Sequence, residues 1–190
     1  MTLFRYDELS VKELEEVDVP VMARWLSDPR VLEYYEGRDR PHDEATVREK
    51  YLDRRESDVT GCMVERAGAP IGYIQFYVLL PEARITLGYG NGPAIYGIDL
   101  FIGEPELWNQ GIGTRLVSAM VDYLFVQKRA GLVIIDPNVD NPRAIRCYEK
   151  AGFRKVRVLP KHELHEGEWL DCCLMKQGRE QQGGNREQAK

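Results

Sequence analysis

The sequence has few residues that could bind zinc or form disulfide bonds. It contains 4 cysteines and 3 histidines in 190 residues, without a C-x-x-C pair or a histidine at zinc-ligand spacing from a cysteine. We therefore expect no metal site. Cys62, Cys147, Cys172 and Cys173 are expected to be reduced and to pack as small hydrophobic residues.

Long apolar runs and a basic excess are also missing. The longest apolar runs, such as 78–80 and 132–135, are too short to span a bilayer. The first residues lack the basic and apolar regions of a secretory signal, so we expect a cytoplasmic protein. The net charge of −5 disfavours nucleic acid, since phosphate binding needs a basic footprint. The negative net charge is compatible with a small cationic substrate. The sequence does not specify an oligomeric state.

Hydrophobic periodicity predicts one mixed α/β domain over residues 1–177. A tail over 178–190 is expected to be disordered because it has almost no apolar side chains to bury. The unit over 95–135 reads as strand, helix and parallel strand, which favours a mixed sheet over a pure dinucleotide-binding layout. Residues 81–93 are expected to form a loop. Strands are expected at 3–6, 62–66, 71–79, 95–102, 132–135, 156–159 and 170–175, and helices at 19–26, 44–54, 111–128 and 141–151.

A glycine-containing turn precedes the strongest helical pattern. Residues 110–114 read Gln110-Gly111-Ile112-Gly113-Thr114. Glycine lets the backbone approach a ligand closely, and the first turn of a helix offers free N–H groups to a phosphate. No P-loop motif occurs, and Leu116 stands where a dinucleotide fingerprint needs its third glycine. On its own, the turn is equally compatible with a simple connection between strand and helix.

Two carboxylates stand at unusual places in apolar strands. Asp99 lies in the middle of the apolar strand expected at 95–102, where an unpaired charge would cost several kcal/mol. We favour a base or a cation-binding group in a cleft, the alternative being a structural ion pair with an arginine. Asp136 ends the strand at 132–135, at the edge where open α/β sheets bind ligands; an ordinary Asp-Pro turn explains it equally well.

Two motifs together resemble the GCN5-related N-acetyltransferase (GNAT) superfamily. They are 110–114 (QGIGT) and 141–153 (NPRAIRCYEKAGF), which has an Asn, an Ala three residues later, a Tyr four after that and a closing Gly-Phe. Segments 25–39, 96–105, 136–137 and 159–167 look like aminoglycoside 6′-N-acetyltransferases, most like the acetyltransferase half of bifunctional acetyltransferase–phosphotransferases. The likeness extends to about Gln177. One departure is Trp108, where the superfamily usually has Gln or Arg.

The resemblance implies the GNAT fold, a mostly antiparallel sheet with a splayed parallel strand pair flanked by helices. It also implies acetyl-CoA as cosubstrate and direct transfer of the acetyl group to an amine. Asp99 would take the amine proton, and Tyr148 would protonate the departing thiolate; Cys147 is not expected to act as a nucleophile. The expected cosubstrate contacts are Leu100, Phe101, Ile102, Gln110, Gly111, Ile112, Gly113, Thr114, Asn141, Ala144 and Tyr148. The expected acceptor contacts are Asp99, Asp136, Tyr35, Glu104 and Glu163.

Two alternatives remain at this point. In the first, the acceptor is not an aminoglycoside but another small amine, such as a polyamine, a peptide N-terminus or a siderophore amine. A module that binds acyl-CoA without catalysis is a further alternative, which the presence of both Asp99 and Tyr148 disfavours.

Overall fold

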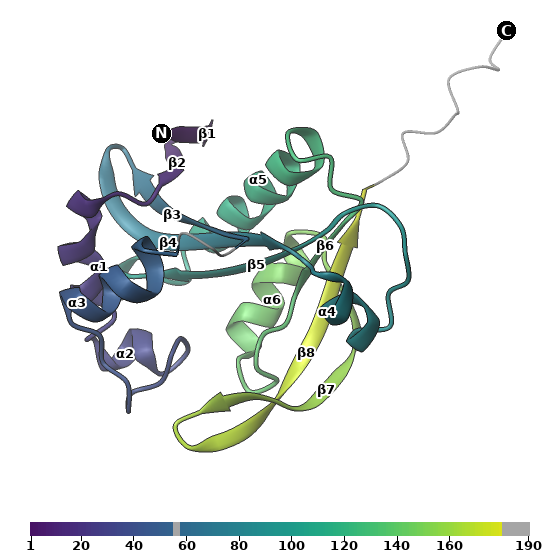
Figure 1. Ribbon diagram of the computed structural model, residues 1–190. Helices are drawn as coiled ribbons and strands as arrows, with labels where there is room; N and C mark the ends of the chain where they lie inside the picture. Colours follow the sequence, from purple (N-terminus) through teal and green to yellow (C-terminus); the bar gives the residue numbers. More distant parts are fainter. Residues whose placement is uncertain (55–57, 180–190) are drawn as a thin grey trace, which may run out of the picture.

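A computed structural model describes residues 1–54 and 58–179 (Figure 1). The strands are β1 (Thr2–Tyr6), β2 (Leu9–Glu13), β3 (Val59–Arg66), β4 (Ala69–Val78), β5 (Ile95–Ile102), β6 (Leu132–Ile135), β7 (Arg154–His165) and β8 (Glu168–Gly178). The α-helices are α1 (Val19–Trp25), α2 (Pro29–Leu32), α3 (Glu44–Val47), α4 (Pro81–Thr86), α5 (Ile112–Val126) and α6 (Pro142–Lys150). The short helical segments are η1 (Glu16–Asp18), η2 (Arg48–Leu52) and η3 (Pro105–Leu107).

The strands form one mixed sheet with the order β1-β2-β3-β4-β5-β6-β8-β7. Among the described residues, β5 and β6 are the parallel pair and all other neighbours run antiparallel. The expectation of a mixed sheet with a parallel unit at 95–135 is confirmed.

Helices cover both faces of this sheet (Figure 1). α5 and α6 pack on one face, where Leu116 and Met120 join Ile98 of β5 in the larger core cluster. α1, α2 and α3 cover the other face around Trp25 and Phe101. β5 is thus buried from both sides by side chains that alternate between the two layers. Within the described part of the chain, no helix is long and apolar enough to cross a bilayer.

Several elements differ from those expected. β2 was missed because only Leu9 and Val11 of its five residues face the core, too short an alternation to stand out. The expectation of an uninterrupted loop at 81–93 was wrong, because Pro81 begins α4. The helix expected over 44–54 consists of α3 and the π-helical η2.

The C-terminal strands are longer than the sequence pattern indicated. β7 and β8 continue through 159–170 as a hairpin with a turn at Glu166 and Gly167. β8 ends at Gly178, one residue past the expected domain boundary. The rest of the expected tail, 180–190, lies outside the described residues.

The parallel pair opens into a gap. β6 pairs with β5 only from Ile95 to Gly97, whereas β4 pairs with β5 as far as Ile102. β6 stops at Ile135 because Pro137 directs the chain away. The second half of β5 therefore has a strand partner on one side and an open side toward α6.

Candidate active site

A cavity of about 1020 Å³ lies where β5 and β6 part. Its lining comes from β5, the start of α5, the loop after β6, α6, residues 33–40 and the tip of the β7–β8 hairpin. The volume is at the upper end of the range for small-molecule sites, roughly 300–1,000 Å³. It leaves room for a long ligand and a second molecule that meets its end.

The glycine turn forms the start of α5 at one wall of this cavity. Gly111 is the N-cap of α5 with a φ of 75°, and no side chain caps the helix. A Cβ at Gly111 would meet no atom within 4 Å, whereas one at Gly113 would lie 3.2 Å from Cys147 Sγ. Gly111 to Thr114 line the cavity. The free N–H groups of the first turn thus fit an anionic phosphate.

Gln110 occupies a different place. Its side chain donates to the Glu106 carbonyl at 2.8 Å, and it is not among the described residues that line the cavity. Any contact from Gln110 to a phosphate would have to come from its backbone.

The open side of β5 presents alternate main-chain groups. Gly103 N donates to Ile71 O and Leu79 N donates to Ile95 O, so odd-numbered residues of β5 form the hydrogen-bonded pairs with β4. The amide of Phe101 is therefore turned to β4. The amide of Leu100 points to the open side and is available to a ligand.

Asp99 lies in the cavity and is held by a polar relay. Its Oδ2 accepts a hydrogen bond from Gln75 Nε2 at 2.7 Å. Gln75 Oε1 in turn accepts from Arg54 at 2.8 Å and from the Tyr73 hydroxyl at 2.9 Å. These two donors fix the orientation of the amide, so that its NH₂ group must face Asp99. No arginine forms an ion pair with Asp99 in the described part of the chain.

The electrostatics of Asp99 suit a base. Burial raises the pKa of Asp99 to about 6, although the hydrogen bond from Gln75 opposes the shift. The nearby carboxylates of Asp136 and Glu163 raise this pKa further. A base with a pKa just below neutrality is mostly ionised at pH 7 and still accepts a proton readily.

Tyr148 lies on α6 with only 7% of its surface exposed, and it lines the same cavity. Burial raises the pKa of its hydroxyl above the ordinary value, so the group stays protonated at neutral pH. Asn141 caps α6 by accepting from Ala144 N at 3.1 Å, and both residues line the cavity. The α6 motif thus places a proton donor beside the open half of β5.

Acidic and aromatic side chains form the rest of the floor. Asp136 Oδ2 lies 2.9 Å from His162 Nε2, and this hydrogen bond raises the pKa of His162. Glu163 also lines the cavity. Tyr35 packs on Phe101 with ring centroids 4.8 Å apart and contributes to the wall. Asp99, Asp136, Glu163 and Tyr35 are thus brought together.

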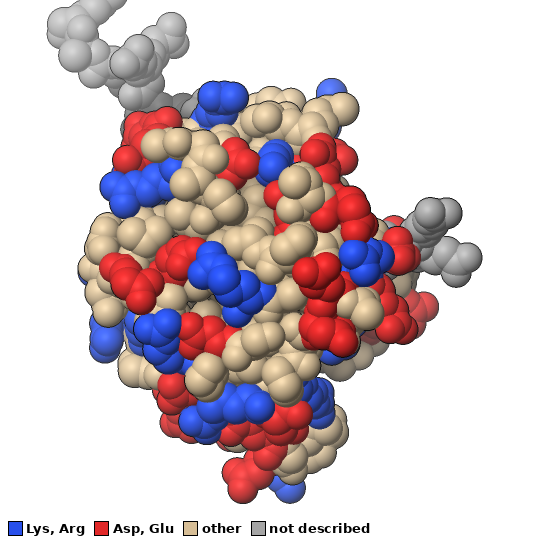
Figure 2. Space-filling model, turned by 90° about the vertical axis from the view of Figure 1, so that its left-hand side faces the viewer, with Lys and Arg blue, Asp and Glu red and all other residues tan. Residues whose placement is uncertain are grey.

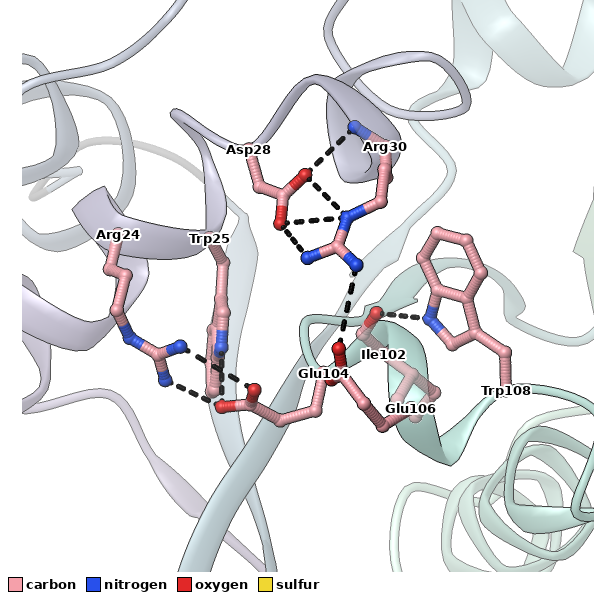
Figure 3. A network of polar contacts seen from close by, with 8 residues as sticks. All are labelled: Arg24, Trp25, Asp28, Arg30, Ile102, Glu104, Glu106 and Trp108. Atoms are coloured by element: carbon pink, nitrogen blue, oxygen red, sulfur yellow. Dashed lines mark hydrogen bonds and ion pairs between the residues drawn. The ribbon is translucent and has the colours of Figure 1, made fainter.

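Glu104 does not join them. Figure 3 shows its carboxylate directed at α1, where it pairs with Arg24 at 2.5 Å and accepts from Trp25 Nε1 at 3.0 Å. Glu104 is not among the described residues that line the cavity. The expectation that Glu104 contacts the acceptor is therefore corrected: this residue joins α1 to the segment after β5.

Three residues of the site were not identified from the sequence. Gln75 orients Asp99. Tyr77 crosses Gly97, where a Cβ would overlap the Tyr77 ring, and it lines the cavity. Arg38 holds Glu166 at 2.6 Å across the cavity mouth. Gln75 is recognised only from the pairing of β4 with β5, in which it stands opposite Asp99.

Comparison with known proteins identifies the architecture. The family model described as "Acetyltransferase (GNAT) domain" matches residues 15–160. The chain belongs to the GNAT acetyltransferase family. It is 34% identical over 151 residues to aminoglycoside N(6′)-acetyltransferase type 1 of Klebsiella pneumoniae, covering 78% of this chain and 75% of the relative. GNAT enzymes use acetyl-CoA, and the start of α5 and the open half of β5 are the parts of this chain that fit it.

Solved structures agree with this assignment. The structure of AAC(6′)-Ib in complex with ribostamycin and coenzyme A superposes with a TM-score of 0.74 at 30% identity, covering 91% of this chain and 94% of the other. A spermidine N-acetyltransferase from Vibrio cholerae reaches a TM-score of 0.73 at 19% identity, which shows a shared fold alone.

One face of this GNAT protein carries charged side chains of both signs. Figure 2 shows basic and acidic side chains on the face that lies on the left of Figure 1, with acidic side chains gathered toward the right-hand edge of the view and no single basic patch. A nucleic-acid footprint would instead gather basic side chains into one patch.

Proposed function

We propose that the protein is an acetyl-CoA-dependent aminoglycoside 6′-N-acetyltransferase. The observation that carries this proposal is the position of Asp99, in one cavity with the phosphate-binding start of α5 and a floor of further carboxylates. An aminoglycoside carries several ammonium groups, and each carboxylate of the floor offers one of them an ion-pair partner. Relatives that carry this activity in their names support the same conclusion.

The residues of the site divide the proton transfers between them. Asp99 attracts the acceptor ammonium and takes its proton, directly or through water, so that the neutral amine can attack. The thioester of acetyl-CoA supplies the acetyl group when it is bound. The amide of Leu100 is placed to stabilise the negative charge that develops on the carbonyl oxygen. Tyr148 then donates its proton to the departing thiolate.

Asp136 is proposed to help bind the acceptor, with His162 as the residue that orients its carboxylate. Because Asp136 is paired with His162, it offers a second ammonium a carboxylate that is already oriented. Tyr35 is proposed to support a sugar ring, and Glu163 to add a weaker contact at the exposed side of the floor.

A substrate panel tests this function. Purified protein is incubated with acetyl-CoA and each acceptor, and the release of free thiol is measured. We expect turnover with kanamycin-type sugars that carry a 6′-amine and none with matched 6′-hydroxyl analogues. Equal turnover of the two groups contradicts 6′ specificity, turnover of spermidine alone favours a polyamine acceptor, and CoA binding without thiol release from any amine favours a non-catalytic module.

A further inference from the structure

The cavity continues beyond the start of α5 along a basic side of α6. Arg143, Arg146 and Lys150 all line it. Their spacing of three and four residues places them on one face of the helix. Thr114 and Cys147, whose Oγ1 and Sγ atoms lie 3.5 Å apart, join α5 to α6 beside this stripe.

These three cations lack acidic partners. No carboxylate lies within salt-bridge distance of Arg143, Arg146 or Lys150 among residues 1–54 and 58–179, whereas Glu149 of the same helix pairs with Lys155 at 3.1 Å. Arg146 and Lys150 are exposed, and Arg143 is half-buried. Basic side chains that face a cavity without a counter-charge are arranged to receive an anion.

Arg143 begins the stripe at the N-terminal end of α6. Its guanidinium lies between two rings, 4.1 Å from the Trp108 centroid and 4.8 Å from the Tyr34 centroid. Stacking of this kind holds a guanidinium in place while leaving its N–H groups free at the edge. A diphosphate held by the free N–H groups at the start of α5 would lie beside Cys147. Arg146 and Lys150, which stand on either side of Cys147 in the sequence and are exposed, are then available to a further anionic group of the same ligand.

We propose that Arg146 and Lys150 form a subsite for the ribose 3′-phosphate of coenzyme A, an inference that rests on coenzyme A being the cosubstrate of the proposed function. This phosphate carries a charge of about −2 at neutral pH, and an arginine and a lysine on adjacent turns supply two matching cations. The acidic floor around Asp99 and the basic stripe then divide one cavity into a part for a cationic acceptor and a part for an anionic cosubstrate.

The test compares coenzyme A with 3′-dephospho-coenzyme A by isothermal titration calorimetry of the full chain without any acceptor. We expect the wild-type protein to bind coenzyme A about tenfold more tightly, since two exposed charge-assisted contacts are involved. The ratio should fall as salt is added. In the double variant Arg146→Ala/Lys150→Ala the ratio should approach one while the affinity for 3′-dephospho-coenzyme A stays unchanged.

Matched variants separate the subsite from general effects of charge. Arg154→Ala removes an exposed arginine of β7 that does not line the cavity, and it should keep the wild-type ratio. Lys150→Arg should also keep it. A wild-type ratio of one, a double variant that still discriminates, or equal weakening of both probes would overturn the proposal.

The outcome is independent of the acceptor. A protein that discriminates between the two probes but acetylates no aminoglycoside would refute the proposed function and leave the subsite intact. A protein that acetylates 6′-amines but binds both probes equally would do the reverse.

Discussion

Replacing Gln75 by leucine removes the one side-chain hydrogen bond found on the Asp99 carboxylate among the described residues. Leucine has a side-chain volume similar to that of glutamine, so β4 and β5 should stay paired. The carboxylate then loses a donor that stabilises its charged form, while burial continues to favour the protonated form. We therefore expect the pKa of Asp99 to rise.

The size of the shift follows from the bond that is lost. A hydrogen bond to a charged group contributes about 1.5–3 kcal/mol, and one pKa unit corresponds to about 1.4 kcal/mol. Starting from a pKa of about 6, the variant should titrate roughly one to two units higher. At pH 7 the ionised fraction would fall from about nine tenths to about half or less.

The assay is kcat/KM for one aminoglycoside as a function of pH, since this parameter reports groups of the free enzyme. Activity depends on ionised Asp99, so the acidic limb should move to higher pH in Gln75→Leu. Using the same acceptor for both proteins keeps the titration of its amines constant. Tyr73→Phe is the control, because it removes one donor to Gln75 Oε1 without touching Asp99, and its limb should move less. An unshifted limb in Gln75→Leu would refute the role given to this relay.

Three further predictions concern catalysis and packing. Asp99→Asn should lower kcat by about 10²–10⁴-fold, while calorimetry shows unchanged affinity for coenzyme A; a variant of normal activity excludes Asp99 as the base. Tyr148→Phe should slow the chemical step in single-turnover experiments by about 10²-fold with little change in KM for the acceptor, and unaltered single-turnover rates would remove it from the mechanism. Gly97→Ala should destabilise the fold by about 1–3 kcal/mol in urea unfolding, because the new methyl group overlaps the Tyr77 ring; a stability equal to wild type would show that this ring moves freely.

The sequence predicted those parts of the fold that depend on local signals. The helical repeat of α5, the apolar run of β6 and Gly152 after α6 each mark their element without help from distant residues. β2 could not be recognised, because its identity depends on pairing with β3. The hairpin formed by β7 and β8 is likewise extended by pairing, across a segment that includes Pro160.

The residues of the candidate site likewise differ in whether a local sequence signal or only a distant contact reveals them. Asp99 could be singled out because a carboxylate in an apolar strand is costly wherever the strand lies. Gln75 and Arg38 could not, since their roles arise from contacts with residues 24 and 128 positions away in the chain. Glu104 was misassigned because only the packing of Trp25 over Gly103 reveals that the chain after β5 turns toward α1.

The alternation along β5 lets one strand serve two ligands independently. Main-chain groups at even positions face the gap beside β6, whereas the side chains at odd positions lie on the Asp99 face. A backbone amide is present at these positions whichever of the non-proline residues occupies them. Substitutions at position 101 can therefore alter the wall that meets the acceptor, while the main-chain groups that face the acetyl-CoA side of β5 stay the same.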